Sequence, residues 1–406
     1  MRLASSPGRL AAVGVFVLIS SGCAGSGEGG PPDPVGVAGT GGSATGEGGA
    51  GQAGTTGTAG TTGSAGASGT TGVAGRGGTT GAAGRGGTTG AAGRGGTTGT
   101  AGRGGTTGVG GAAGGALEFV GNITTNNVVD TDGKIFKTYW NQISPENAGK
   151  WGSVQTSATA TFNWRTLDAV YDYTQTNGIL FKEHTFIWGS QQPTGSITQA
   201  NVQTWMTEFC KRYPNTKMID VVNEPPPHTT PAYADAIGGG TNGNWQWITN
   251  SFTWARAACP GAILILNDYN NIEWSGDNTH YLSIISALKT AGAPIDAIGA
   301  QAHDLDNAGV STTTVRSLLA KLATTGALPI YVTELDLSYT DDNQQLTAYQ
   351  QWFPLLRDSG YVKGITIWGW IYGKTWAPSP NSGLIRNGAF RPAMTWLMQQ
   401  LGRPTQ

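Results

Sequence analysis

Eight short apolar runs alternate with helix-length segments between residues 117 and 406, and this alternation strongly limits how the chain can fold. The runs lie at residues 118–124, 139–146, 179–186, 218–224, 262–269, 295–303, 329–336 and 362–369. Two of the segments between them are typical of helices: 163–178, with Asn163 placed as an N-cap and Gly178 as a stop, and 280–292. Strands and helices that alternate about eight times predict an α/β protein with a (β/α)8 TIM barrel.

Residues 24–116, in contrast, lack the large apolar residues that a folded domain needs. They contain no aromatic residue and no Leu, Ile or Met, whereas all 14 tryptophans lie at 117–406. Such a segment cannot bury enough apolar surface to offset the entropy lost on ordering. Its nine-residue repeat, seen from Arg76 to Arg103, lacks the aspartates and large apolar residues of calcium-binding nonapeptide repeats. We therefore predict a disordered Gly/Thr-rich linker at 24–116, followed by one folded domain at 117–406.

The first 23 residues predict export. A positively charged start precedes an apolar run at 10–19, and small residues lead to Cys23. The run is too short to span a bilayer. Its end resembles a bacterial lipobox, in which the cysteine is lipidated and becomes the mature N-terminus, although Ser20 stands where leucine is usual. We expect 1–23 to be a signal peptide and the mature protein to be either a cell-surface lipoprotein or a secreted protein.

Charge and motif content argue against several classes of function. The net charge is −1 and only 12% of residues are charged, so there is no basic excess to bind nucleic acid and no polybasic patch for a membrane surface. The four histidines lack HxxxH spacing and the three cysteines lack a CxxC pair. Neither a GxSxG elbow nor a GxxxxGK[ST] loop is present. We expect a monomer without metal, cofactor or nucleic-acid partner.

Polar residues recur where the apolar runs end. Seven residues terminate or nearly terminate a run: Glu146, His184, Glu224, Asp268, His303, Glu334 and Trp368. Each alone could be a capping group or a solvated strand end, but the C-terminal ends of barrel strands meet at one mouth, where active sites form. Glycoside cleavage needs two carboxyl groups flanking the bond, and Glu224 and Glu334 provide such a pair.

Seven motifs carry a family resemblance. They are PENAGKW (145–151), EHTFIWGSQQP (183–193), DVVNEP (220–225), NDYN (267–270), IGAQAH (298–303), TELD (333–336) and ITIWG (365–369). Together, and in this order, they resemble glycoside hydrolase family ten, which is dominated by endo-β-1,4-xylanases. The resemblance runs from about Leu117 to the chain end. It implies a retaining barrel enzyme that hydrolyses β-1,4 linkages inside xylan.

The resemblance also implies roles for individual residues. Glu224 would be the general acid/base and Glu334 the nucleophile. Asn223 would hydrogen-bond the sugar 2-hydroxyl, His303 would hydrogen-bond the nucleophile, and Asp336 would orient that histidine. Further residues are expected to hold the sugar, with Gln301 near the nucleophile and the tryptophans stacking on sugar rings: Glu146, Asn147, Lys150, His184, Trp188, Gln191, Gln301, Trp368 and Trp376.

The chain departs from the family pattern around the cleft. Gly189 stands where the family usually has histidine, and Gly149 where it has methionine. A tryptophan usual after the QxP is replaced by Thr194 and Gly195, and an arginine usual after the last loop tryptophan is missing. The two carboxyl groups are unaffected. These departures put sugar affinities and tolerance of decorated substrates in doubt.

Two other functions and one covalent feature stay open. The scaffold could serve a β-glycanase that acts on cellulose or mixed-linkage glucan, or a non-catalytic carbohydrate-binding protein.

Cys210 and Cys259 lie on the helical segments before the fourth and fifth strands, which would be neighbours on the outer ring of the barrel. In an exported protein they could form a disulfide or remain two buried thiols.

Substitution of the cysteine tests membrane attachment. If Cys23 carries lipid, Cys23→Ser removes the attachment site, so the protein should move from the membrane fraction to the soluble fraction of expressing cells. Immunodetection after fractionation measures the partition, with Ser21→Ala as a control in the same segment. An unchanged partition would leave simple secretion as the better account.

Overall fold

The computed structural model describes residues 116–240 and 243–406. The predicted signal peptide with Cys23, the arginine repeats and nearly all of the predicted linker lie outside these residues. No helix in the described part of the chain is long and apolar enough to cross a membrane.

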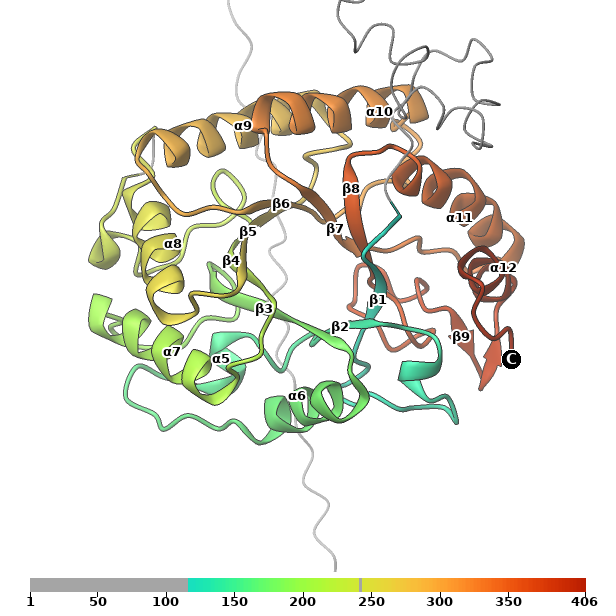
Figure 1. Cartoon of the computed structure of the whole chain (residues 1–406), viewed down its shortest axis with the longest axis horizontal. Helices are drawn as coiled ribbons and strands as arrows, with labels where there is room; N and C mark the ends of the chain where they lie inside the picture. Colours follow the sequence, from blue (N-terminus) through green and yellow to red (C-terminus); the bar gives the residue numbers. More distant parts are fainter. Residues whose placement is uncertain (1–115, 241–242) are drawn as a thin grey trace, which may run out of the picture. The chain divides into compact units, whose positions relative to one another are not determined.

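Eight parallel strands close into a barrel in sequence order, from β1 to β8 and back to β1 (Figure 1). The strands are β1 (Phe119–Ile123), β2 (Gln142–Ser144), β3 (Leu180–Trp188), β4 (Met218–Asn223), β5 (Ile263–Asp268), β6 (Ala297–Ala300), β7 (Ile330–Leu335) and β8 (Val362–Ile367). Each lies within or largely within one of the predicted apolar runs. The predicted (β/α)8 barrel is therefore confirmed.

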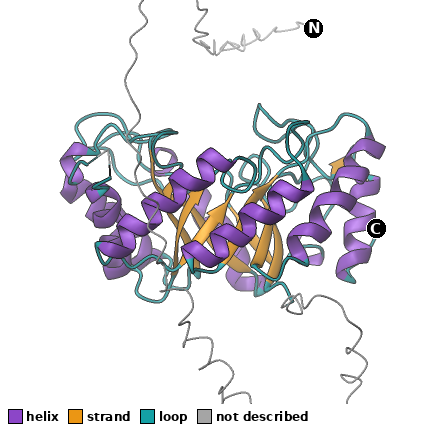
Figure 2. Ribbon diagram, turned by 90° about the horizontal axis from the view of Figure 1, so that it is seen from above, coloured by secondary structure: helices purple, strands orange, loops and turns teal. Residues whose placement is uncertain are grey.

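Helices surround the strands on the outside of the barrel (Figure 2). They are α5 (Trp151–Val154), α6 (Arg165–Asn177), α7 (Gln199–Arg212), α8 (Gln246–Ala258), α9 (Ser275–Thr290), α10 (Thr312–Lys321), α11 (Asp342–Arg357) and α12 (Pro392–Leu401). Short elements complete the described part: η3 (Phe136–Thr138), η4 (Asp235–Ile237), η5 (Leu322–Gly326), β9 (Ile385–Arg386) and β10 (Ala389–Phe390).

The two predicted helices are present with corrected starts. Gly178 ends α6 in the left-handed region, at φ 64°, because glycine adopts that conformation without a Cβ clash. The N-cap of α6 is Trp164 and not Asn163, whose side chain instead accepts a 3.4 Å hydrogen bond from the backbone N–H of Arg165. The helix predicted at 280–292 begins earlier, at Ser275.

Large aromatic side chains fill the space between strands and helices. Trp140, Trp205, Trp247 and Trp370 are all at most 1% exposed. Trp205 of α7 stacks on Trp164 with ring centroids 5.5 Å apart and on Trp151 at 5.9 Å, which fixes α7 against the segments on either side. These indoles therefore pack the core and are not available to a ligand at the barrel mouth.

The strand register brings polar residues to one level at the barrel mouth. Trp188, Asn223 and Asn267 are consecutive partners across β3, β4 and β5. Irregularities in register between β3 and β4, and between β4 and β5, precede these positions, and such bulges change the direction of the following side chains. Side chains far apart in the sequence therefore converge where the strands end.

Cys210 of α7 and Cys259, which follows α8, form a disulfide with Cα atoms 5.5 Å apart. Of the two alternatives for these cysteines, a disulfide or two buried thiols, the structure has the disulfide. It joins two neighbouring outer helices across 49 residues of sequence.

Removal of this bond should lower stability without changing the barrel mouth. A cross-link that closes a loop of this length contributes roughly 2–4 kcal/mol by limiting the unfolded chain. Cys210→Ala/Cys259→Ala should therefore lower the free energy of unfolding by about that amount, measured by urea denaturation. Reducing agent should destabilise the parent protein and leave the double variant unchanged. Equal stability of the oxidised parent and the variant would contradict the assignment.

Candidate active site

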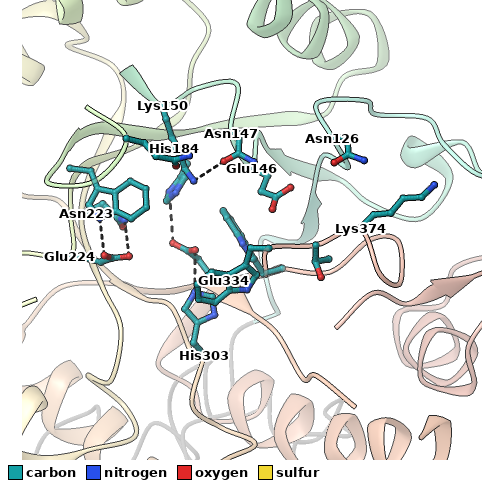
Figure 3. Close-up of a pocket in the computed structure, with 15 residues that line it drawn as sticks. Asn126, Glu146, Asn147, Lys150, His184, Asn223, Glu224, His303, Glu334 and Lys374 are labelled. Carbon is teal, nitrogen blue, oxygen red and sulfur yellow. Dashed lines mark hydrogen bonds and ion pairs between the residues drawn. The ribbon is translucent and has the colours of Figure 1, made fainter. Parts of the chain in front are cut away.

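A cavity of about 360 Å³ opens at the mouth of the barrel, lined by residues at or just beyond the strand ends (Figure 3). Twelve of its lining residues were predicted as site residues: Glu146, Asn147, Lys150, His184, Trp188, Gln191, Asn223, Glu224, His303, Glu334, Trp368 and Trp376. The two remaining predicted residues, Asp336 and Gln301, lie behind this lining and hydrogen-bond to it. Asn126, Lys374 and Thr375 also line the cavity and were missed.

Glu334 lies on β7 at the bottom of the cavity and is only 4% exposed. The amide of Asn267 donates to its Oε1 at 2.7 Å, and Nε2 of His303 lies 3.4 Å from its Oε2. Burial opposes ionisation of Glu334, but His184, His303 and Lys182 outweigh that effect and lower its pKa to about 2. Glu334 is thus a carboxylate near neutral pH.

His303 connects Glu334 to a second buried carboxylate. Its Nδ1 lies 2.8 Å from Oδ1 of Asp336, and the indole N–H of Trp376 donates to Oδ2 of Asp336 at 3.0 Å. Burial opposes the charged imidazole, but Asp336 and Glu334 raise the pKa of His303 well above its usual value. The ring of Trp376 lies 4.7 Å from the imidazole. Asp336 therefore holds His303 with its other ring nitrogen toward Glu334.

Glu224 follows β4 and is held from three sides. The indole N–H of Trp188 donates to its Oε2 at 2.8 Å, while the amides of Asn223 and Gln301 donate to its Oε1, each at 3.3 Å. Its φ of 51° is left-handed, a conformation that costs energy outside glycine and here turns the side chain into the cavity. Gln301 was predicted near the nucleophile, but its hydrogen bonds go to Glu224 and Asn223.

Asn267 is a site residue that the sequence did not single out. It lies on β5 with no exposed surface. Its amide nitrogen donates at 2.7 Å to both Oδ1 of Asn223 and Oε1 of Glu334, and its Oδ1 accepts from the hydroxyl of Thr333 at 2.6 Å. One buried side chain therefore fixes the distance between the two strands that carry the carboxyl pair. The NDYN motif was the available signal.

His184 and Asp220 form a second buried pair beside Glu334. Nδ1 of His184 lies 2.9 Å from Oδ2 of Asp220 and 3.8 Å from Oε1 of Glu334. The rings of His184 and Trp368 meet edge to face, with centroids 5.1 Å apart. The ligand atoms of His184, Asp220 and Glu334 lie within 4.8 Å of one another, but Lys182 already forms an ion pair with Asp220. The cluster is therefore explained by charge pairing and needs no metal ion.

The loop after β2 supplies the other end of the cavity (Figure 3). Nζ of Lys150 donates to Oδ1 of Asn147 at 3.0 Å and lies 4.8 Å from the ring centre of Trp188. Burial raises the pKa of Glu146 to about 7, with Lys150 opposing and Glu334 adding to the shift. Burial likewise lowers the pKa of Lys150. Hydroxyl-binding groups of both kinds, donors and acceptors, thus lie together on one side of the carboxyl pair.

Comparisons with known proteins agree with this geometry. The model of a family described as Glycosyl hydrolase family 10 matches residues 111–400. Endo-1,4-beta-xylanase B of Cellvibrio japonicus is 43% identical over 291 residues, which cover 70% of this chain and 46% of that protein. Endo-1,4-beta-xylanase B of Thermotoga neapolitana is 28% identical over 264 residues, covering 60% of this chain and 74% of that protein. The chain thus spans less than half the length of the first relative.

A solved structure supports the fold. The crystal structure of native xylanase 10B from Thermotoga maritima superposes with a TM-score of 0.61 at 24% sequence identity. The match covers 70% of this chain and 94% of that one.

Histidine titration tests the charged state of the site. Because Asp336 holds the proton on His303, the ring should stay protonated through neutral pH, and Asp336→Asn should lower the pKa of His303 by removing that charge. NMR of the imidazole signals measures this, since the chain has four histidines. His280, whose Nε2 contacts the carbonyl of Pro226, serves as the internal reference. A His303 signal that titrates identically in both proteins would contradict the assignment.

Proposed function

Because the chain belongs to glycosyl hydrolase family 10, we propose that it is an endo-1,4-β-xylanase that cleaves xylan with retention of anomeric configuration. The supporting observation is the contrast between its two cavity carboxyl groups. Glu334 lies against His303, Asn267 and His184 and is ionised. Glu224 lies across the cavity among neutral donors from Trp188, Asn223 and Gln301. A retaining glycosidase needs this division between a nucleophile and a proton donor.

The first step follows from these positions. Glu334 attacks the anomeric carbon while Glu224 transfers a proton to the departing glycosidic oxygen, so a glycosyl ester forms on Glu334 and a shortened sugar chain leaves. Asn223, next to Glu224, is placed to bond the 2-hydroxyl of the attacked sugar, whose charge grows in the transition state. Its own amide oxygen is fixed by Asn267 at 2.7 Å.

The second step reverses the direction of proton transfer. Ester formation removes the negative charge of Glu334, and Glu224 then takes a proton from the water that attacks the ester. Because Asn267 and His303 remain bonded to Glu334, the carboxylate that is released needs no rearrangement of its surroundings. The products are a xylo-oligosaccharide of retained configuration and a regenerated pair of carboxyl groups.

Residues beside the pair are proposed to hold the sugar on the nonreducing side of the bond. They are Glu146, Asn147, Lys150, His184, Trp188, Gln191, Trp368 and Trp376, all of which line the cavity. Trp376 also donates to Asp336, so its proposed sugar contact is coupled to the position of His303. Trp368 lines the cavity but is only 3% exposed.

We also propose export of the protein, supported by the charged start and apolar run of residues 1–23. Lipid attachment at Cys23 is the finer proposal, and it would hold the xylanase at the cell surface. An extracellular location suits a polymeric substrate that cannot enter the cell.

Polysaccharide digestion tests the substrate. The wild-type protein should release short xylo-oligosaccharides from xylan, with much less product from cellulose or mixed-linkage glucan. Chromatography of the products measures this. Equal or greater release from cellulose would overturn the proposed substrate, and the absence of product from all three would overturn the proposed activity.

Alanine variants of the two carboxyl residues test their separate roles. Glu224→Ala should reduce xylan hydrolysis by at least ~10²–10⁴-fold, because the sugar leaving group needs a proton. An aryl xylobioside with an acidic phenol needs little protonation, so its first step should stay fast and the glycosyl-enzyme should accumulate. Azide needs no base and should restore turnover with a β-azide product.

Glu334→Ala should respond differently, since no ester can form without the nucleophile. Azide should restore activity only by direct attack, which gives the α-azide. Glu208→Ala, which removes a surface carboxylate paired with Lys211 on α7, should have wild-type rates. The roles are wrong if both active-site variants show the same dependence on leaving group, or if Glu224→Ala yields the α-azide.

A further inference from the structure

Glu183 is a buried carboxyl group that the proposed mechanism does not use. It lies on β3 beside His184, has no exposed surface, and neither of its carboxyl oxygens has a hydrogen-bond partner among the described residues. Burial, together with the nearby charge of Asp220, raises the pKa of Glu183 well above its usual value. A buried polar group without a partner is costly, so its presence requires a reason.

Gly149 lies directly against this carboxyl group. A Cβ atom at position 149 would lie 2.7 Å from Oε2 and 2.8 Å from Oε1 of Glu183, and 2.7 Å from the carbonyl oxygen of His184. These distances are shorter than carbon–oxygen contacts allow. The carboxyl group of Glu183 occupies the space that a side chain at position 149 would need, and only glycine fits there without a shift of its neighbours.

The segment that rests on Glu183 carries sugar-binding residues. Gly149 is flanked by Ala148, which is 3% exposed, and Lys150, which is 8% exposed. The backbone N–H of Lys150 donates to the carbonyl of Asn147 at 3.2 Å, and Nζ of Lys150 donates to the side chain of Asn147 at 3.0 Å. A shift of Gly149 would therefore move both side chains.

The same segment is connected to the acid/base. Lys150 lies 4.8 Å from the ring centre of Trp188, and Trp188 donates to Glu224 at 2.8 Å. Contacts therefore run without a break from Glu183 and Gly149 through Lys150 and Trp188 to Glu224. Each of these residues is buried or half-buried, so a shift of one side chain cannot easily be absorbed by empty space beside it.

We infer that Glu183 is a positioning residue: its carboxyl group, packed against Gly149, sets the position of the loop 145–150 and thereby of Asn147 and Lys150 in the sugar cleft. This inference rests on the proposed function, because it assigns the loop to sugar binding. It is independent of which carboxyl group is the nucleophile.

The charges around Glu183 determine which replacement preserves its role. Asp220 already carries the ion pair with Lys182 and the hydrogen bond with His184. An ionised Glu183 would add a second negative charge to this group and compete for Lys182. A neutral side chain of the same shape should therefore substitute for it, which makes Glu183→Gln the conservative variant.

Four variants and one control test the inference. Glu183→Ala removes the support, Gly149→Ala pushes the loop away from it, the double variant combines both changes, and Glu183→Gln keeps the shape. Gly261→Ala is the control, because a Cβ at that glycine meets nothing within 4 Å. Each protein is assayed with an aryl xylobioside for kcat and KM, and by calorimetry for its affinity for xylotriose, well below its unfolding temperature.

Glu183→Ala and Gly149→Ala should each raise KM and the Kd of xylotriose about tenfold, the effect expected when a hydrogen bond to a charged group is misplaced. The change in kcat should be smaller, since Lys150 lies away from the reacting bond. Glu183→Gln and Gly261→Ala should stay close to wild type. In the double variant the loss should be clearly less than the product of the two single losses, because the methyl group introduced at position 149 gains part of the vacated space.

A merely structural role would give another pattern. Glu183→Ala with a lower unfolding temperature but wild-type KM and Kd would overturn the inference, as would independent effects of the two substitutions. If Glu183→Ala does not fold, Glu183→Asp, which withdraws the carboxyl group from Gly149, should give the same loss of affinity. A wild-type protein that binds xylotriose but does not cleave xylan would overturn the proposed activity alone.

Discussion

The arrangement of the barrel mouth depends on keeping one buried carboxylate charged. Glu334 is 4% exposed, and burial alone would favour its neutral form. His184, His303, which Asp336 orients, and Lys182 outweigh that preference, and the pKa of Glu334 falls to about 2. These groups lie on β3 or just beyond the ends of β6 and β7. The ionised state of Glu334 is therefore a property of the closed barrel and not of any local segment.

The closed barrel also holds Glu224 and Glu334 in fixed but different surroundings. Asn267 donates to Asn223, beside Glu224, and to Glu334, so one side chain of β5 fixes the position of β4 relative to β7. Two glycines that neighbour the lining residues Lys150 and Trp188 in the sequence are closely packed. A Cβ at Gly149 would overlap the carboxyl group of Glu183, and a side chain at Gly189 would collide with Thr229 and Thr230.

The fold and the carboxyl pair were predictable because their signals are local, whereas most other lining residues were assigned through the family resemblance. Each strand is a short run of branched apolar residues, and Glu224 and Glu334 terminate such runs, so alternation alone located them. Asn267 and Asp220 lie inside strands, and their roles arise only from partners on other strands. Gln301 was expected near Glu334, and its hydrogen bonds to Glu224 and Asn223 could not be read from the sequence for the same reason. Glu183 gave no signal, because a glutamate beside a histidine shows neither its burial nor the glycine above it.

Trapping of the covalent intermediate tests the central claim, that Glu334 is the ionised nucleophile of a retaining pair. A 2-deoxy-2-fluoro-β-xylobioside with a dinitrophenolate leaving group should inactivate the protein, since the fluorine slows hydrolysis of the ester more than its formation in the presence of so good a leaving group. Mass spectrometry of the digested protein should find one added disaccharide, on the peptide that carries Glu334. An adduct on the peptide that carries Glu224, or rapid xylan cleavage with no adduct at all, would contradict the account.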